Sequence, residues 1–142
     1  MAEDFDLEEF LPYALNRAAE AASLGFQAIY KAQYGMLRTE WRVLAHLGRY
    51  GDMTASGICL RARLHKTKVS RAVKALESRR FLTRRVVDAD RRQEVLSLTA
   101  SGAAAFRHLA AEARSFDARL AARLSPDDLS ALRRALRALS VD

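Results

Sequence analysis

The 142-residue sequence has one cysteine, two prolines, six glycines and no long hydrophobic run. The single cysteine, Cys59, cannot form an internal disulfide, which removes the main sign of an oxidising compartment. A bilayer span needs about 20 apolar residues, whereas the longest stretches without a charge, such as 95–106, are far shorter. The acidic start, MAEDFDLEEF, does not resemble the basic first part of a secretory signal. We therefore expect a cytoplasmic protein that does not contact a membrane.

Proline and glycine are too scarce for a flexible linker, and no repeat is visible. A chain of this length that is 50% hydrophobic is expected to fold as one domain, 1–142, with a substantial core. Glycine-rich phosphate loops are also absent, and the three histidines are scattered. His108 and Glu112 have the i, i+4 spacing of two metal ligands, but a third ligand is not evident. We predict no enzyme activity, no metal site and no cofactor.

Positive charge is concentrated in one part of the chain. Residues 61–92 carry 12 basic and 3 acidic side chains, a net charge of +9, whereas residues 1–36 carry 2 basic and 6 acidic ones. The whole chain has a net charge of +7, so this block holds the entire excess. Such a concentration is typical of a surface that binds a polyanion. A solvated charged face without a partner is the alternative.

The spacing inside this block predicts an amphipathic helix over about 66–80. Its apolar side consists of Val69, Ala72, Val73 and Leu76. The opposite side is basic and rich in hydroxyl groups and consists of Thr67, Ser70, Arg71, Lys74 and Ser78. Short side chains let a helix lie deep in the major groove of DNA, where Arg or Lys can reach guanine O6 and N7. An ordinary surface helix has the same periodicity and stays open.

The preceding residues favour a helix-turn-helix. Thr54 can cap a short helix that runs to about Ala62, and a short connection leads to the next helix. Small and apolar residues lie where the two helices would cross: Ile58, Cys59, Ala62, Leu64 and Val69. Arg63 occupies the turn position where glycine is usual, and a left-handed backbone there costs about 1 kcal/mol. In this arrangement Cys59 is a buried packing residue, and a buried thiol is usually inert.

Two strand-like runs, FLTRRVV and EVLSLT, follow the basic helix. The polar loop DADRRQ between them predicts a β-hairpin whose tip carries arginine. Such a side chain suits the narrow minor groove of A·T-rich DNA. Asp90 is two residues from Arg92 and can hold its guanidinium in position. A surface hairpin with an ordinary charge pair is the alternative.

Long helices are predicted at both ends of the chain. Residues up to Tyr34 form a helix that Gly35 can end, and a second helix starts near Thr39 and breaks at YGDMT. The first helix has an apolar spacing of Phe10, Ala14, Arg17/Ala18, Ala21, Leu24 and Ala28. The C-terminal region has two apolar stripes, Phe106, Leu109, Ala113, Phe116, Leu120 and Leu124, and, after the cap Ser125 and Pro126, Leu129, Leu132, Leu136 and Leu139.

These stripes exceed what a small DNA-binding lobe can cover, so we expect them to pair with a second copy. Intramolecular packing is the alternative. A dimer would place two basic helices about 34 Å apart, one turn of duplex, to match a palindromic operator.

Three segments together resemble the MarR family of winged-helix transcriptional regulators. They are TEWRVLAHLGRYG (39–51), LHKTKVSRAVKALESRRFLTRR (64–85) and DADRRQEVLSLTASG (88–102), the last being similar to the family's D-R-R…L-T..G wing signature. The resemblance implies a mainly α fold with a small β-hairpin wing, in which residues 37–102 form a winged helix-turn-helix lobe and residues 1–36 and 103–142 form dimerisation helices. The sequence departs from the family's pattern at His65, Arg63 and Arg80, where an acidic cap and glycines are common.

The resemblance also implies site residues. DNA would be contacted by Thr67, Lys68, Ser70, Arg71 and Lys74 of the recognition helix and by Arg91 and Arg92 of the wing, with Asp90 orienting Arg92. It further implies a small-molecule effector, often aromatic, for which Tyr13, Arg17, Trp41 and His46 are candidates; aromatic residues that merely fill space are the alternative. The expected function is that of a homodimeric transcriptional repressor that binds double-stranded DNA and is released from it by that effector. A sequence-indifferent architectural DNA protein and a winged-helix protein-interaction module remain competing hypotheses.

Overall fold

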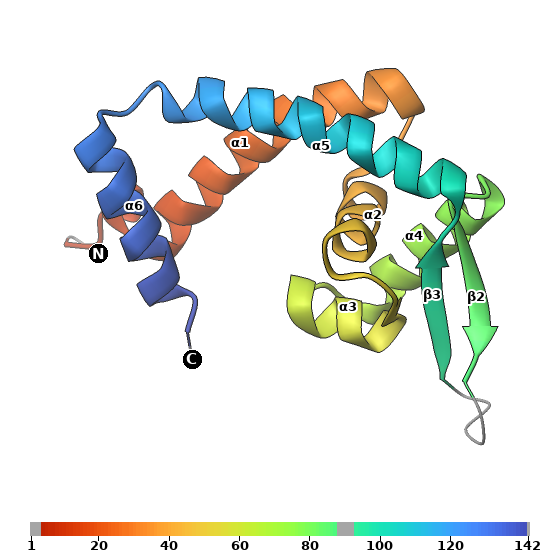
Figure 1. Ribbon diagram of the computed structural model, residues 1–142. Helices are drawn as coiled ribbons and strands as arrows, with labels where there is room; N and C mark the ends of the chain where they lie inside the picture. Colours follow the sequence, from red (N-terminus) through yellow and green to blue (C-terminus); the bar gives the residue numbers. More distant parts are fainter. Residues whose placement is uncertain (1–3, 88–92, 142) are drawn as a thin grey trace.

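A computed structural model describes residues 4–87 and 93–141 (Figure 1). The chain is mainly helical with a small three-stranded antiparallel sheet, which confirms the expected fold class. The elements in order are η1 (Leu7–Glu9), α1 (Leu11–Tyr34), α2 (Arg38–Tyr50), β1 (Met53–Thr54), α3 (Ala55–Ala62), α4 (Lys66–Ser78), β2 (Leu82–Val86), β3 (Glu94–Leu98), α5 (Ala100–Ala121) and α6 (Pro126–Leu139).

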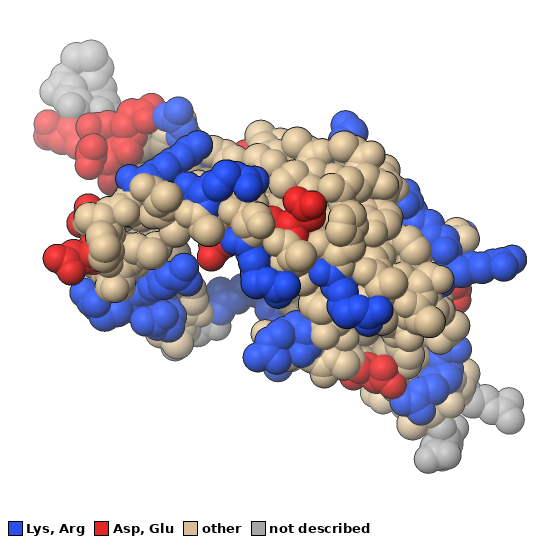
Figure 2. Space-filling view, turned by 45° about the horizontal axis from the view of Figure 1, so that its top comes forward, with Lys and Arg blue, Asp and Glu red and all other residues tan. Residues whose placement is uncertain are grey.

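The helices α1 and α5 cross to form one layer, and the elements from α2 to β3 form a lobe beneath one end of that layer (Figure 1). The helix α6 descends from the other end of α5, near the chain's N-terminal part (Figure 1), and the space-filling view shows a gap between it and the lobe (Figure 2). Arg63, between α3 and α4, bridges this gap by donating to the Ser140 carbonyl at 2.8 Å. In the described parts of the chain, no helix has both the length and the apolarity needed to cross a membrane.

The core lies where the lobe meets α1 and α5. Its fully buried side chains come from all the helices from α1 to α5 and from β2 and β3, and they include Tyr30, Leu44, Ile58, Leu76, Leu82, Leu96 and Leu109. On α1, burial falls on Phe26 and Tyr30, whereas the apolar spacing that includes Leu24 faces outward. α1 therefore has two faces, one packed against the lobe and one that a single chain leaves exposed.

Most of the expected helix ends are confirmed, but the first helix starts later than expected, at Leu11 after the extended residue Phe10, and α4 ends at Ser78 rather than near Arg80. Gly35 ends α1 in the left-handed conformation at φ 61°, and the hydroxyls of Thr54 and Ser125 accept from the amides of Gly57 and Asp128. The expected cap at Thr39 is wrong, because α2 begins at Arg38 with Leu37 as its N-cap. The carboxylate of the buried Glu40 accepts the Leu37 amide at 3.3 Å, so a side chain three residues inside the helix caps it.

The hairpin of β2 and β3 pairs Leu82 with Leu98 and Val86 with Glu94, close to the expected strand bounds. A third strand, β1, was not predicted, because two residues are too few to show an alternating pattern. It pairs Met53 with Leu96 and Thr54 with Val95, so the hairpin is anchored to the residues just before α3.

The start of α5 is fixed against the beginning of the hairpin. The Thr99 hydroxyl caps α5 by accepting the Gly102 amide at 3.0 Å, and it donates to the Arg80 carbonyl at 2.6 Å. The Thr99 amide donates to the Phe81 carbonyl at 3.0 Å. Gly102 lies so close to the Phe81 backbone that a Cβ there would be 2.8 Å from its carbonyl carbon. The L-T..G part of the motif therefore joins α5 to the lobe.

Candidate nucleic-acid interface and adjoining pocket

The helix α4 presents one buried and one exposed face, as its sequence predicts. Val69, Ala72, Val73 and Leu76 are buried in the lobe. The five residues of α4 that are expected to contact DNA all lie on the exposed face: Thr67, Lys68, Ser70, Arg71 and Lys74. The structure therefore brings these side chains together on one accessible surface, with the basic side chain of Lys66 at its start.

Local hydrogen bonds stabilise both ends of α4. His65 is its N-cap, and its Nδ1 accepts the Thr67 amide at 3.2 Å. At the other end the Phe81 amide donates to Leu76 and the Arg80 amide to Glu77, while Arg80 has a φ of 62°. This is a Schellman ending with arginine where glycine is common. The departures at His65 and Arg80 thus leave the helix ends intact.

The connection from α3 to α4 has the expected helix-turn-helix geometry. Ile58, Ala62 and Val69 are buried at the crossing, and Arg63 takes the left-handed conformation at φ 54°. Cys59 is only partly buried, which corrects the expectation of full burial. It packs against the core and lines a shallow surface hollow shared with Lys66 and Ser70.

The hairpin of β2 and β3 projects from the lobe on the side away from the α1 and α5 layer (Figure 1). Three predicted wing residues, Asp90, Arg91 and Arg92, lie outside the described residues. The strands that carry the tip are described, and they extend next to α4 in the lobe. α4 and the hairpin therefore form one end of the molecule.

Part of the basic block is used inside the protein. Arg79 donates to the carbonyls of Tyr34 and Gly35, which ties the end of α4 to the end of α1. Arg84 binds Glu77 of α4 at 3.1 Å and Glu94 of β3 at 3.4 Å. Arg85 pairs with Asp52, just before β1, at 3.2 Å. The bond of Arg84 to Glu77 joins the hairpin to α4, and that of Arg85 to Asp52 joins it to the turn before β1. Because these arginines are paired, the net charge of the block overstates the charge available to DNA.

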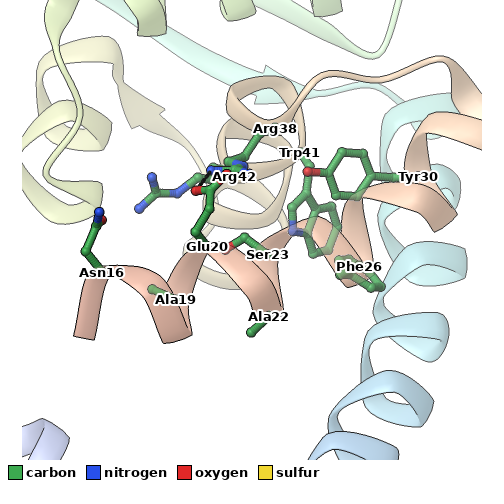
Figure 3. Close-up of a pocket in the computed structure, with 10 residues that line it drawn as sticks. All are labelled: Asn16, Ala19, Glu20, Ala22, Ser23, Phe26, Tyr30, Arg38, Trp41 and Arg42. Carbon is green, nitrogen blue, oxygen red and sulfur yellow. Dashed lines mark hydrogen bonds and ion pairs between the residues drawn. The ribbon is translucent and has the colours of Figure 1, made fainter. Parts of the chain in front are cut away.

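A pocket of about 500 Å³ lies between α1 and α2 (Figure 3). Its inner part is aromatic. Phe26 meets Trp41 edge-on at a centroid distance of 5.2 Å, and Tyr30 stacks on Trp41 at 6.0 Å. Burial raises the pKa of Tyr30 above its ordinary value.

The rim of this pocket is charged. Arg38 and Arg42 reach it from α2, and Glu20 points toward them from α1 (Figure 3). The Arg38 guanidinium donates from Nη1 and Nη2 to the two carboxylate oxygens of Glu20, at 2.9 and 3.0 Å. That bond lowers the pKa of Glu20 and raises the pKa of Arg38, so both side chains are ionised. Planar aromatic walls and paired cations suit a flat anionic molecule.

Of the four residues expected to bind an effector, the structure places only Trp41 in this pocket. Arg17 pairs with Glu8 at 2.7 Å and lies 5.7 Å from the centre of the Tyr13 ring. His46 Nδ1 is 2.6 Å from the Arg42 carbonyl, one turn back along α2. Glu20 and Arg38 were not predicted as site residues, because a pair formed across 18 residues leaves no local signal in the sequence.

A second hollow, of about 400 Å³, is apolar and lies between α1 and the C-terminal helices. It is lined by Leu15, Ala18, Ala19, Ala22, Leu120, Arg123, Leu124, Leu132 and Leu136. No residue of α6 from Pro126 to Leu139 is buried, and Leu132, Leu136 and Leu139 are 43%, 42% and 55% exposed. The predicted C-terminal stripe thus stays open to solvent in a single chain.

Comparisons with known proteins agree with this geometry. The MarR family model matches residues 34–93. A search of curated proteins finds no match. The MarR family transcriptional regulator SPO1453 from Silicibacter pomeroyi DSS-3 is 32% identical over 96% of both chains, with a TM-score of 0.82.

Two further structures are similar. A second MarR family transcriptional regulator of Silicibacter pomeroyi is 26% identical over 94% of this chain and 89% of its own, with a TM-score of 0.79. BpsR of Bordetella bronchiseptica, whose DNA binding is regulated by 6-hydroxynicotinic acid, shares the fold at 21% identity, with a TM-score of 0.85 over 97% of this chain and 99% of its own.

Proposed function

The chain belongs to the MarR family of transcriptional regulators, and from that premise we propose that it is a homodimeric repressor that binds a palindromic operator and is released by a small anionic aromatic effector. Family membership establishes a DNA-binding regulator rather than an enzyme. The dimer, the operator's symmetry, the repressor role and the effector are the proposal.

The observation that carries the DNA-binding part is the exposed face of α4. Lys68, Arg71 and Lys74 share it with two small hydroxyl side chains, while the opposite face is buried. Small polar side chains allow close approach to the base edges, and the cations reach phosphates or guanine. The hairpin beside α4 supports a second contact in the neighbouring minor groove, made by Arg91 and Arg92.

The apolar hollow between α1 and α6 supports the homodimer. Seven leucines with exposed fractions of at least 36% lie on α1, on α6 or just before α6: Leu11, Leu15, Leu24, Leu124, Leu132, Leu136 and Leu139. A contiguous apolar surface of this kind marks an interface, and a two-fold axis lets identical surfaces cover each other. The assignment of 1–36 and 103–142 to dimerisation remains part of this proposal.

The pocket between α1 and α2 supports effector control, because it lies where the helical layer meets the lobe. BpsR shows that this fold can couple a small heteroaromatic acid to DNA binding. A ligand that binds one orientation of the lobe relative to α1 more tightly than another favours that orientation, and so changes the separation of the two recognition helices. By linkage, the factor by which the ligand changes operator affinity equals the factor by which the operator changes ligand affinity.

Selection of duplexes from a random-sequence library tests the proposal. We expect a palindromic site bound at least about 10³-fold more tightly than scrambled DNA. An Arg71→Ala variant should lose about tenfold or more in affinity for it, whereas Arg107→Ala, a matched change at an exposed position of α5, should not. Equal affinity for all sequences would favour an architectural protein, and no duplex affinity would favour an interaction module. Transcription in vitro from a promoter that overlaps the selected site distinguishes a repressor from an activator.

A further inference from the structure

The guanidinium of Arg38 is already occupied by an internal carboxylate. Glu20 meets it with both oxygens in a parallel two-bond arrangement, at 2.9 and 3.0 Å, and Gln27 accepts a third bond at 3.4 Å. Arginine binds an external carboxylate with the same two-bond geometry. Glu20 therefore occupies the position that the carboxylate of an aromatic acid would take at the rim of the pocket.

The charges at the rim do not balance. Two guanidinium groups, those of Arg38 and Arg42, meet one carboxylate, that of Glu20. Arg42 donates to the Ala62 carbonyl at 3.0 Å, which fixes its position without neutralising it. The rim thus keeps one positive charge while Glu20 is in place and has two when Glu20 leaves. Glu20 is 52% exposed at its side chain, so it can leave into water at little cost.

We propose that Glu20 is an internal competitor for the effector, and that exchange of Glu20 for the effector's carboxylate on Arg38 is the switch of this regulator. The inference rests on the proposed function and adds to it a regulatory residue, Glu20, that competes with the carboxylate of the effector. Exchange replaces one two-bond ion pair by another, so the aromatic contacts with Phe26 and Trp41 supply the net gain of binding.

The exchange has a mechanical consequence, because the pair joins two parts of the molecule. Glu20 belongs to α1 of the helical layer, and Arg38 is the first residue of α2 in the lobe. Arg38 holds α1 through the carboxylate of Glu20, the side-chain oxygen of Gln27 and the side chain of Tyr30, and Glu20 is the charged partner among these three. When a ligand takes Arg38, α1 loses this ion pair to the lobe, while the bonds of Arg79 to the Tyr34 and Gly35 carbonyls remain. One restraint on the orientation of the lobe is thereby removed.

The test uses the full-length protein and its only tryptophan, Trp41, as a reporter inside the pocket. Benzoate is the probe, and benzamide is its neutral counterpart of the same shape. In Glu20→Gln and Glu20→Ala proteins we expect Kd for benzoate to fall about five- to tenfold, because the competing charge-assisted pair is gone. Kd for benzamide should not change. Adding Arg38→Gln to either variant should cancel the gain.

Operator binding supplies the second readout. Without benzoate, Glu20→Gln should bind the selected operator several-fold more weakly than wild type, and benzoate should weaken it further by a smaller factor than in wild type. Glu8→Gln is the matched control, since Glu8 also pairs with an arginine, Arg17, but does not line the pocket. It should match wild type in both assays.

Equal benzoate affinity in wild type and both Glu20 variants would overturn the inference, as would failure of the Glu20 variants to bind benzoate at all. Either result leaves the proposed function standing if wild type still selects a palindromic operator. Loss of operator selection in wild type itself would instead refute the proposed function, whatever benzoate does.

Discussion

Replacing Gly102 by alanine tests the joint between α5 and the lobe. A Cβ at this position would lie 2.8 Å from the Phe81 carbonyl carbon and 3.1 Å from its Cα, and closer still to the carbonyl oxygen. The obstacle is backbone rather than a flexible side chain, and that backbone is held by the Thr99 amide and by the Leu82 and Leu98 pair beside it. Relief therefore requires α5 to move away from the hairpin.

The expected cost follows from three effects. Overpacking typically costs about 1–3 kcal/mol, and a backbone clash belongs at the upper end. Movement of α5 also weakens the bond between Thr99 and Phe81, which is worth about 1 kcal/mol. Against these costs, alanine stabilises the helix by up to about 1 kcal/mol relative to glycine, because of its higher helix propensity. We therefore expect Gly102→Ala to lower the free energy of unfolding by about 3 kcal/mol.

Urea unfolding followed by circular dichroism, at one fixed protein concentration, measures this change. With a slope of about 1–3 kcal/mol per M, the midpoint should fall by about 1 M or more. Ser101→Ala, at the exposed neighbouring position, is the control and should stay within about 0.5 kcal/mol of wild type. A Gly102→Ala midpoint at or above that of wild type would refute the reasoning, because it would mean that α5 does not pass so close to Phe81.

Four further outcomes are expected. The logarithm of the operator association constant should fall with the logarithm of salt concentration at a slope near −5 for about six phosphate contacts, and a flat titration would contradict DNA binding. Arg80→Gly should raise the free energy of unfolding by about 0.5–1 kcal/mol, because Arg80 has a φ of 62°; a loss in urea unfolding would argue against that conformation. Leu132→Asp should turn a dimer into a monomer in sedimentation equilibrium, whereas Ser130→Asp, an exposed change on the same helix, should not. Because its bond to Arg38 lowers the pKa of Glu20, the stabilisation from this pair should be present above about pH 4.3 and be lost as the pH falls through the lower folded pKa; unfolding of Glu20→Gln should lack that pH dependence.

The lobe was predictable because its elements carry strong local signals. The apolar spacing from Val69 to Leu76 predicts which face of α4 is buried, and cap residues such as Thr54 and Ser125 mark helix starts. The predicted N-cap at Thr39 was wrong. A hydroxyl favours an N-cap locally, but Met36 is fully buried and Glu40 accepts the Leu37 amide, so α2 starts earlier. Tertiary packing outweighs the intrinsic preference of one residue at such a boundary.

The pocket was much less predictable, because its composition depends on how α1 is rotated about its axis. Phe26 and Tyr30 fix that rotation by packing into the core, which turns Glu20 toward α2. Tyr13 and Arg17 belong to the same helix, but they do not line the pocket. A periodic pattern shows that α1 has an apolar face without showing which of two faces meets the lobe. The ion pair of Glu20 and Arg38 arises only once that rotation is set.

Arginines and lysines of the basic block have different roles, which follow from the chemistry of their side chains. Arg79, Arg84 and Arg85 hold neighbouring elements through fixed bonds to carbonyls and carboxylates, for which a planar guanidinium with several donors is suited. Lysines predominate on the exposed face of α4, where a mobile point charge can follow the phosphate backbone. It follows that removing Arg84 should disturb the angle between hairpin and α4, and hence discrimination between operators, more than the salt dependence of binding. Removing Lys68 should change the salt dependence of binding more than the discrimination between operators. Some of the positive charge that marks the block as a DNA-binding surface therefore belongs to arginines that hold the elements of that surface in position.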